Sequence, residues 1–247
     1  GVTTTLYACL RGLDAYLHDI QTIGDIGGRE LINISPFETN AEDPLEETLK
    51  RCIRVEPDVI LLDPISDPDV ARVVAAFHDK CTMITEISSK DAAAGLLQWA
   101  EWLGDPGLAA ASLCGAISQK LIRRLCAECK EAYKPNPSML RKIGLDPDEI
   151  QVLYRKARPA SEMLERGEEI EPCYICNDTG YTGRVAIFEL IEMNDAIRGL
   201  VASGADTAAL RAGARSEDML TLQKDAMRHV SDGTTSLEEL QRVFKNA

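Results

Sequence analysis

Aromatic residues, histidine and positive charge are all scarce in this sequence. Only 5% of the 247 residues are aromatic, three are histidine, and 27 Lys and Arg stand against 40 Asp and Glu, which gives a net charge of −13. Such an acidic chain repels phosphate backbones and anionic lipid, so we expect no nucleic acid partner. The three histidines are scattered without a serine or cysteine partner at a suitable spacing, which argues against a hydrolase triad.

Long apolar runs are also missing. No stretch approaches the length that crosses a bilayer and no signal peptide is visible, so we expect no direct membrane insertion. The chain begins with Gly1 rather than Met, as a fragment or a trimmed product would, and the missing leader therefore excludes little. Apolar residues make up 45% of the chain, which is enough for the core of one large domain or two ordinary ones.

The eight cysteines fall into two kinds. Four are isolated in apolar surroundings, where a free thiol behaves as a small buried hydrophobe: Cys9, Cys52, Cys81 and Cys114. The others form two C-x-x-C pairs, Cys126 with Cys129 and Cys173 with Cys176. Two such pairs complete the tetrahedral thiolate shell that zinc prefers, and a closed shell predicts a structural metal. Two redox dithiols or two disulfides are the alternative, which a reducing compartment disfavours.

The first half of the chain alternates helical and extended patterns. Apolar residues recur at helical spacing over 45–53, a continuous apolar run follows at Val59–Leu62, and Asp67 with Pro68 is typical of a helix start. We expect a second strand over about 81–87, followed by a helix that buries Trp99 and Trp102. This alternation predicts an α/β sheet with right-handed crossovers.

The second half predicts a small module and then helices. Asp105 and Pro106 predict a helix that runs to about Leu125, and the charged stretch from Tyr133 to Pro172 predicts a module held by its metal. A strand over about 181–190 returns to the main body, and helix starts follow at Asp206 and at the capping box Ser236 to Glu239. The expected domains are a core over 1–125, a zinc-binding module over 126–183, and a returning strand with a helical C-terminal subdomain over 184–247.

Three segments carry a resemblance to a known family. These are Leu121–Lys130, Cys173-Tyr-Ile-Cys176-Asn-Asp-Thr-Gly-Tyr-Thr-Gly-Arg184, and Gly233-Thr-Thr-Ser236-Leu-Glu-Glu239. Together they resemble the type II secretion and type IV pilus assembly ATPases over nearly the whole chain. The resemblance implies an α/β fold with a RecA-like P-loop NTPase core, truncated at its N-terminus, an inserted tetracysteine zinc module and a helical C-terminal subdomain.

The first residues resemble the family's sequence at the end of the P-loop, G-x-x-x-x-G-K-[ST]. Gly1 stands at the final glycine, Val2 at the lysine and Thr3 at the hydroxyl residue that binds Mg²⁺. The resemblance implies that Gly1, Thr3 and Thr4 contact nucleotide. Valine, however, supplies no charge for the phosphates.

Other positions depart from the family's pattern. A segment similar to T-I-E-D-P has Gly24 in place of its glutamate and retains only Asp25. A segment similar to the Walker B sequence D-I-I-x-V-G-E-I-R-D has Pro64 for the glutamate that orients water and Ser66 for the arginine. Ser88 stands where the family has histidine. Four such losses predict a weakened or abandoned hydrolytic site.

Two candidates remain near this site. Asp63 stands where the family has glycine and follows four apolar residues, as Mg²⁺-binding carboxylates do in many P-loop NTPases. With Thr3, it is a candidate metal partner and a candidate catalytic residue. The alternative is a turn aspartate before Pro64. Arg54, with Lys50 and Arg51, resembles the family's arginine segment, which implies contact with nucleotide across a subunit boundary. The alternative is a solvated helix face.

The implied function follows from the family. Its members are cytoplasmic hexameric ATPases, peripheral to the inner membrane, that drive secretion or pilus assembly through an inner-membrane platform. Two hypotheses remain open for this chain. One is a motor ATPase with weak or lost hydrolysis, and the other is a non-hydrolysing structural or regulatory homologue in a homo- or hetero-hexameric ring. Zn²⁺ is the expected cofactor, with Mg-ATP bound weakly or not at all.

Overall fold

The computed structural model describes residues 1–24, 31–40, 42–157 and 172–245. Contacts between residues group the chain into two compact units: the first unit contains 1–118 and 189–219, and the second contains 119–188 and 220–247. The predicted division into three domains, with boundaries at residues 125 and 183, stays a prediction. The two compact units have other boundaries. Within the described ranges, no helix is both long enough and apolar enough to cross a bilayer.

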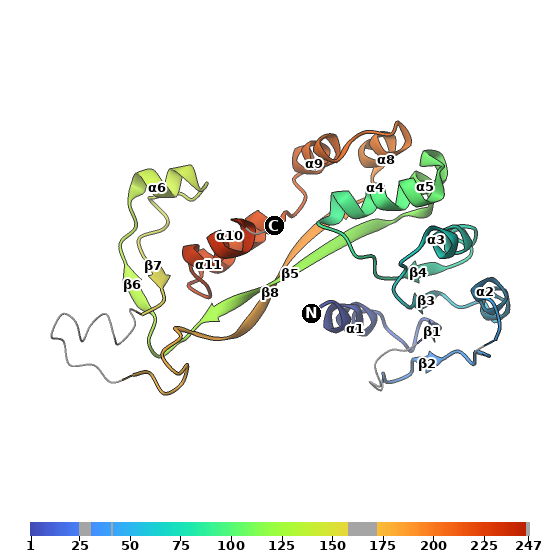
Figure 1. The fold of residues 1–247 in the computed structure, drawn as a ribbon, viewed down its shortest axis with the longest axis horizontal. Helices are drawn as coiled ribbons and strands as arrows, with labels where there is room; N and C mark the ends of the chain where they lie inside the picture. The colour runs from blue at the N-terminus through green and yellow to red at the C-terminus, as the bar shows by residue number, and fades with distance from the viewer. Residues whose placement is uncertain (25–30, 41, 158–171, 246–247) are drawn as a thin grey trace. The chain divides into compact units, whose positions relative to one another are not determined.

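A four-stranded parallel sheet forms the centre of the first unit (Figure 1). Its order is β2-β1-β3-β4, and its strands are β1 (Ile20–Ile23), β2 (Ser35–Pro36), β3 (Val59–Leu62) and β4 (Thr82–Ile84). All four residues of β3 are buried, which confirms the strand predicted from the apolar run Val59–Leu62. Parallel strands covered on both faces read as continuous apolar runs, because neither face meets water.

Helices pack on both sides of this sheet. On one side is α1 (Val2–Gly12), and the larger apolar cluster on the other side includes residues of α2 (Leu45–Ile53), α3 (Pro68–Ala75), α4 (Ala92–Leu103) and α5 (Pro106–Ser112). Two further helices, α8 (Asp195–Ala202) and α9 (Thr207–Ser216), pack against α4 and contribute to the same cluster. Successive strand residues point to opposite faces. Val59 and Leu61 accordingly pack against Leu10 of α1, whereas Ile60 and Leu62 belong to the larger cluster on the other face.

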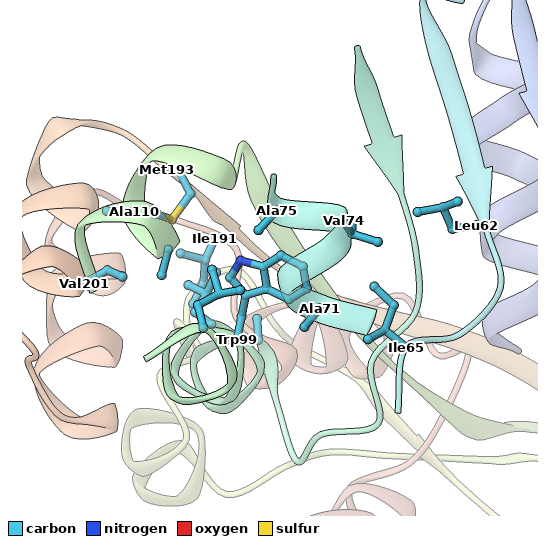
Figure 2. Packing of buried hydrophobic residues seen from close by; sticks show 14 of the residues in the cluster. Leu62, Ile65, Ala71, Val74, Ala75, Trp99, Ala110, Ile191, Met193 and Val201 are labelled. Atoms are coloured by element: carbon cyan, nitrogen blue, oxygen red, sulfur yellow. The ribbon is translucent and has the colours of Figure 1, made fainter. Parts of the chain in front are cut away.

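Trp99 is buried in that larger cluster, among the side chains shown in Figure 2. Its indole nitrogen donates to the Ser112 hydroxyl at 3.0 Å, which satisfies the buried polar group. Trp102 packs against the same cluster, so the prediction of core tryptophans is confirmed. The prediction for isolated cysteines holds for Cys52, which is buried, and is wrong for Cys114, which is exposed.

The predicted helix from Asp105 to Leu125 is wrong in its second half. Asp105 caps α5 by accepting from the Leu108 amide at 3.0 Å, but α5 ends at Ser112. The residues that follow form strand β5 (Gly115–Leu125), which pairs with β8 (Tyr181–Glu192). A distant partner strand supplies the backbone hydrogen bonds here, and such pairing overrides local helix propensity.

The second unit has its own apolar core. It contains β6 (Glu131–Tyr133) antiparallel to β7 (Leu153–Arg155), together with α6 (Pro137–Lys142), α10 (Leu222–Ser231) and α11 (Leu237–Lys245). Leu140 and Leu153 are buried with Ile122 and Ile187 of the long strand pair. The described part of the stretch after Tyr133 therefore packs against an apolar core, which the sequence did not predict, and the expectation that a metal holds this module stays a prediction.

Candidate metal centre and nucleotide site

The four cysteines of the C-x-x-C pairs come together in the second unit. Cys126 and Cys129 lie in the turn that follows β5, and Cys173 and Cys176 lie in the turn that precedes β8. All four sulfur atoms lie within 4.8 Å of one another, and this group could hold a metal ion. The Sγ atoms are 3.9 Å apart between Cys126 and Cys173 and 3.6 Å apart between Cys129 and Cys176.

These distances fit a tetrahedral metal. A metal–sulfur bond of about 2.3 Å places the sulfurs of a tetrahedron about 3.8 Å apart. All eight cysteines of the chain are free thiols. The donor set of four thiolates is the one that structural zinc takes, so the residues present fit the ion that the sequence predicts.

We call the turn with Cys126 and Cys129 the first ligand loop and the turn with Cys173 and Cys176 the second ligand loop. Residues that favour turns build the second of these. Asn177, Asp178 and Gly180 have φ values of 49°, 60° and 76°, in the left-handed region that favours asparagine, aspartate and glycine. The Gly180 amide donates to the Cys176 sulfur at 3.3 Å, and the Gly180 carbonyl accepts from the Cys126 amide at 3.0 Å. Gly180 thus ties the two ligand loops together through its backbone.

The crowded thiols shift each other's ionisation. Burial opposes ionisation of Cys126, but hydrogen bonds from Thr182 and from the backbone amides of Glu128 and Cys129 lower its pKa to about 6. The pKa of Cys129 is raised by burial and by the neighbouring thiols. A cation bound in the centre would relieve this conflict, because metal binding replaces the thiol protons.

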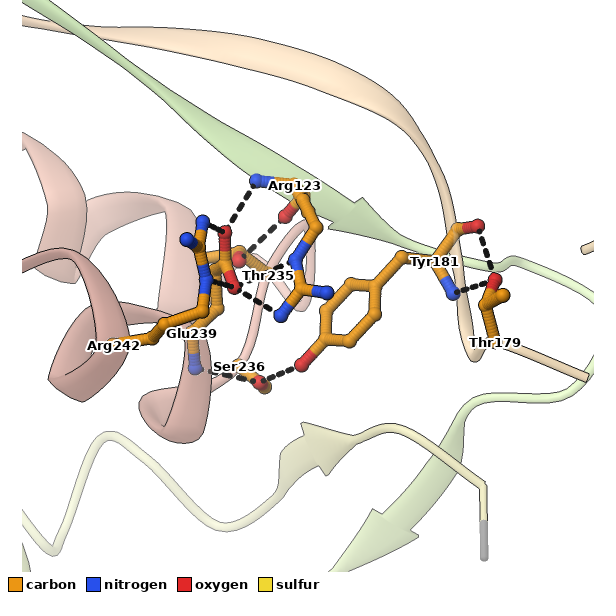
Figure 3. Close-up of polar contacts among 7 residues, drawn as sticks. All are labelled: Arg123, Thr179, Tyr181, Thr235, Ser236, Glu239 and Arg242. Carbon is orange, nitrogen blue, oxygen red and sulfur yellow. Dashed lines mark hydrogen bonds and ion pairs between the residues drawn. The ribbon is translucent and has the colours of Figure 1, made fainter. Parts of the chain in front are cut away.

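A buried carboxylate lies on α11 of the same unit (Figure 3). Glu239 is fully buried, and its carboxylate accepts from the backbone amide and guanidinium of Arg123 at 2.9 and 2.8 Å. Arg242 binds the same carboxylate at 2.6 and 2.8 Å. Burial opposes ionisation of Glu239, but the two guanidinium groups lower its pKa to about 2.

The sequence predicted a different role for Glu239. The Ser236 hydroxyl does accept from the Glu239 amide at 3.3 Å, as a capping box requires. The carboxylate, however, turns to Arg123, which is 116 residues away along the chain. Nothing in the local pattern around Arg123 or Glu239 indicates this pairing.

The first residues form the start of α1. Gly1 is the N-cap and makes no side-chain cap bond, so the helix is not capped by threonine. Thr3 and Thr4 are exposed in the first turn, which contains no acidic residue. Because α1 packs on the sheet and leads into β1, its first turn lies toward the edge where the parallel strands end.

Asp63 lies at that edge, directly after β3. Its amide donates to the Ile23 carbonyl of β1 at 3.2 Å, and its own carbonyl accepts from the Thr85 hydroxyl at 2.9 Å. Gly24 has a φ of 109°, and a Cβ atom added there would lie 2.1 Å from the Asp63 carboxyl carbon. The Asp63 side chain therefore occupies the space into which a side chain at position 24 would project. Asp25 lies outside the described residues.

The basic residues of α2 take up different positions. Lys50 pairs with Glu46 at 2.9 Å and with Glu47 at 3.0 Å, and Arg51 pairs with Asp43 at 2.9 Å. The two Lys50 pairs are typical of a solvated helix face, whereas Arg51 is half-buried. Arg54 is the C-cap of α2 and is exposed.

Comparison with known proteins decides the family. Residues 1–242 match the family described as "Type II/IV secretion system protein". The chain belongs to this family. It is 31% identical over 250 residues to the "Type II secretion system protein HxcR" of Pseudomonas aeruginosa, covering 100% of this chain and 47% of the relative. It is also 31% identical to the "Type IV pilus assembly ATPase PilB" of Thermus thermophilus, covering 97% of this chain and 26% of the relative.

This family member thus spans about half or less of the length of those relatives. Solved structures share its fold. The "Pilus Retraction Motor PilT" with bound ADP is 15% identical with a TM-score of 0.57, covering 91% of this chain and 52% of that one. The ATPase DotB of Legionella pneumophila is 13% identical with a TM-score of 0.56, covering 94% and 55%. The α/β fold is therefore the fold of these ATPases.

Proposed function

We propose that this chain is the P-loop portion of a motor protein for type II secretion or type IV pilus assembly, with weak or lost ATP hydrolysis. The proposed setting is a cytoplasmic hexameric ring that acts on an inner-membrane platform. The main support for a loss of hydrolysis is Val2. This exposed apolar residue lies at the start of α1, where the family's sequence has lysine. Pro64 removes the family's second charged group, after β3.

A second function rests on the same residues. The chain is then a non-hydrolysing structural or regulatory subunit, which in a mixed ring completes the assembly without turning over ATP. Separate measurements of ATP binding and ATP hydrolysis distinguish the two functions, because a regulatory subunit can bind without hydrolysing.

The residues at the sheet edge fit magnesium-bound nucleotide in part. The uncapped first turn of α1 offers backbone amides to an anion, and Thr3 offers a hydroxyl. Asp63 offers a carboxylate at the end of β3, against the backbone of Gly24. Bound magnesium would neutralise phosphate charge, while Gly1, Thr3, Thr4 and Asp63 hold and orient the nucleotide. Arg54 is the proposed contact across a subunit boundary.

We expect the change Asp63→Asn to weaken magnesium-dependent nucleotide binding by about tenfold or more, because a charged metal partner contributes well over 1 kcal/mol. Calorimetric titration with Mg-ADP measures the affinity, and the same titration in EDTA measures the part that needs no metal. Asp79→Asn is the matched control, since Asp79 is paired with Lys80 on the surface. Equal affinities for the chain and for Asp63→Asn would assign Asp63 to the turn alone.

We also propose that Cys126, Cys129, Cys173 and Cys176 bind one structural zinc ion, and that residues 126–183 form the zinc-binding module. The support is the fit of four free thiols to a tetrahedral shell. With no open position for water, the ion would fix the two ligand loops and take no part in hydrolysis.

For the change Cys173→Ser, we expect bound zinc to fall from about one per chain to none and the second unit to lose about 3 to 4 kcal/mol, as for a site with zinc at 100 to 1,000 times its Kd. Both tryptophans belong to the first unit, so their fluorescence should show an unchanged unfolding midpoint. Metal analysis and circular dichroism measure the losses. Cys114→Ser, at an exposed isolated thiol, is the control. Absence of zinc from protein purified without chelator would refute the proposal.

A further inference from the structure

The second ligand loop is bonded to the start of α11. The Thr179 hydroxyl donates to the Cys176 carbonyl at 2.7 Å, and the Gly180 amide donates to the Cys176 sulfur at 3.3 Å. The next residue, Tyr181, places its hydroxyl 3.1 Å from the Ser236 hydroxyl. Ser236 is the residue that caps α11, so a single side chain joins the metal loop to the helix start (Figure 3).

The first ligand loop holds the turn that precedes α11. The Leu125 amide, one residue before Cys126, donates to the Thr234 carbonyl at 2.9 Å. On the other side of Cys126, the Lys130 ammonium donates to the Gly233 carbonyl at 2.9 Å. Both bonds depend on the path of the backbone around Cys126.

Tyr181 also lies against the buried ion pair. The Arg123 guanidinium is 4.0 Å from the centre of the Tyr181 ring, and the Arg123 carbonyl accepts from the Thr235 hydroxyl at 2.8 Å. The same guanidinium binds Glu239. The ring thus covers one side of a charge pair whose carboxylate has no exposure, and a buried charge network must keep all its partners or lose much of its stability.

We propose that the tetracysteine centre and helix α11 form one metal-dependent unit, in which Tyr181 is the positioning residue that couples them. Metal binding fixes the two ligand loops, the loops fix Tyr181 and the turn 233–235, and these hold Glu239 between Arg123 and Arg242. Release of the metal frees α11. This inference rests on the proposed metal centre. It adds that the C-terminal helix, which carries no ligand, responds to metal occupancy.

Hydrogen exchange on the full chain tests the forward direction. Removal of the metal with a chelator should speed amide exchange over 237–245 by about 5- to 150-fold, the usual range for coupling between two sites. Exchange across the first unit, which contains none of the four cysteines, should change far less. Unchanged exchange in α11, in protein shown to lose its metal, would overturn the coupling.

Zinc affinity tests the reverse direction, because the coupling between two binding equilibria is reciprocal. Tyr181→Phe and Ser236→Ala should each lower the affinity for zinc in equilibrium competition with a colorimetric chelator, since each removes one end of the 3.1 Å contact. Tyr174→Phe is the matched control, because Tyr174 lies between two ligands but is 85% exposed. Substitution of Co²⁺ should leave the absorption spectrum of Tyr181→Phe unchanged, which shows an intact ligand shell.

The outcomes separate the two proposals. If the unmodified chain binds neither Zn²⁺ nor Co²⁺, the metal centre itself fails, and the coupling fails with it. If metal binds, but with equal affinity in the unmodified chain, in Tyr181→Phe and in Ser236→Ala, the metal centre stands and the coupling is wrong. Two substitutions at opposite ends of the contact keep the test decisive if one variant does not fold.

Discussion

ATP turnover by the unmodified chain should not exceed the background rate. Phosphoryl transfer depends on positioning and on stabilisation of charge that develops in the transition state. On the proposed correspondence with the family's motifs, Val2 and Pro64 replace two charged groups, one at the phosphates and one at the attacking water. Loss of one such preorganised contact costs about 10²–10³ in rate, and the two losses act on the same step, so they need not multiply.

Substitutions that restore the family's residues should recover nucleotide binding before they recover ATP turnover. Val2→Lys should recover nucleotide binding first, because an ammonium group at the start of α1 attracts phosphate before any chemistry occurs. Adding Pro64→Glu should recover at most part of the turnover, since Gly24, Ser66 and Ser88 still differ from the family's residues. Phosphate release assays measure turnover, and calorimetry measures binding. Val2→Gln is the control, because it adds length and polarity without charge.

Rapid hydrolysis by the unmodified chain would contradict this expectation. If Asp63→Ala then abolished that activity, the carboxylate after β3 would carry the metal chemistry in spite of Val2. Turnover that survives Asp63→Ala would instead point to a contaminating ATPase.

Loss of the Glu239 carboxylate should destabilise the second unit by about 3 kcal/mol, the lower end of the usual cost of breaking a buried ion pair, because the two arginines left behind are partly exposed. Glu239 is fully buried and binds two arginines, so Glu239→Ala leaves Arg123 and Arg242 facing a cavity. Glu239→Gln keeps the shape but removes the charge, and it should cost less. Urea unfolding followed by circular dichroism measures both. Glu238→Gln is the matched control, because Glu238 is exposed on the same helix turn.

Low pH should lower the stability of the second unit, as Glu239→Gln does, because protonation removes the charge of Glu239. The pKa of Glu239 in the folded state, about 2, lies below its ordinary value of 4.5. A depressed carboxyl pKa stabilises the fold above the ordinary pKa, and that contribution is lost as pH falls from about 5 toward 2. It amounts to about 2 to 3 kcal/mol, less than the full conversion of the shift, because the guanidinium groups are partly exposed. Glu239→Gln should remove this part of the pH dependence, and an unchanged acid profile in the variant would show that Glu239 does not titrate in this range.

The contacts around Glu239 also explain why part of the sequence pattern was informative and part was not. Ser236 and Glu239 predicted a helix start, which the structure confirms, because a capping box acts within one turn of backbone. The role of the carboxylate depended on Arg123, which only folding brings near. In the same way, Asp105 correctly predicted the start of α5. No residue near Leu125 indicated that β5 would pair with a strand more than fifty residues away.

The sequence by itself determined the family, the α/β alternation of the first unit and the identity of the four grouped cysteines. Each of these depends on local spacing: apolar runs and helix caps act over a few residues, and a C-x-x-C pair sets two thiols in one turn. Tertiary structure alone decided that the described stretch after Tyr133 has an apolar core, that Asp63 fills the space beside Gly24, and that Glu239 is buried between two arginines. Those features come from pairing between segments far apart in the chain, for which local pattern contains no signal.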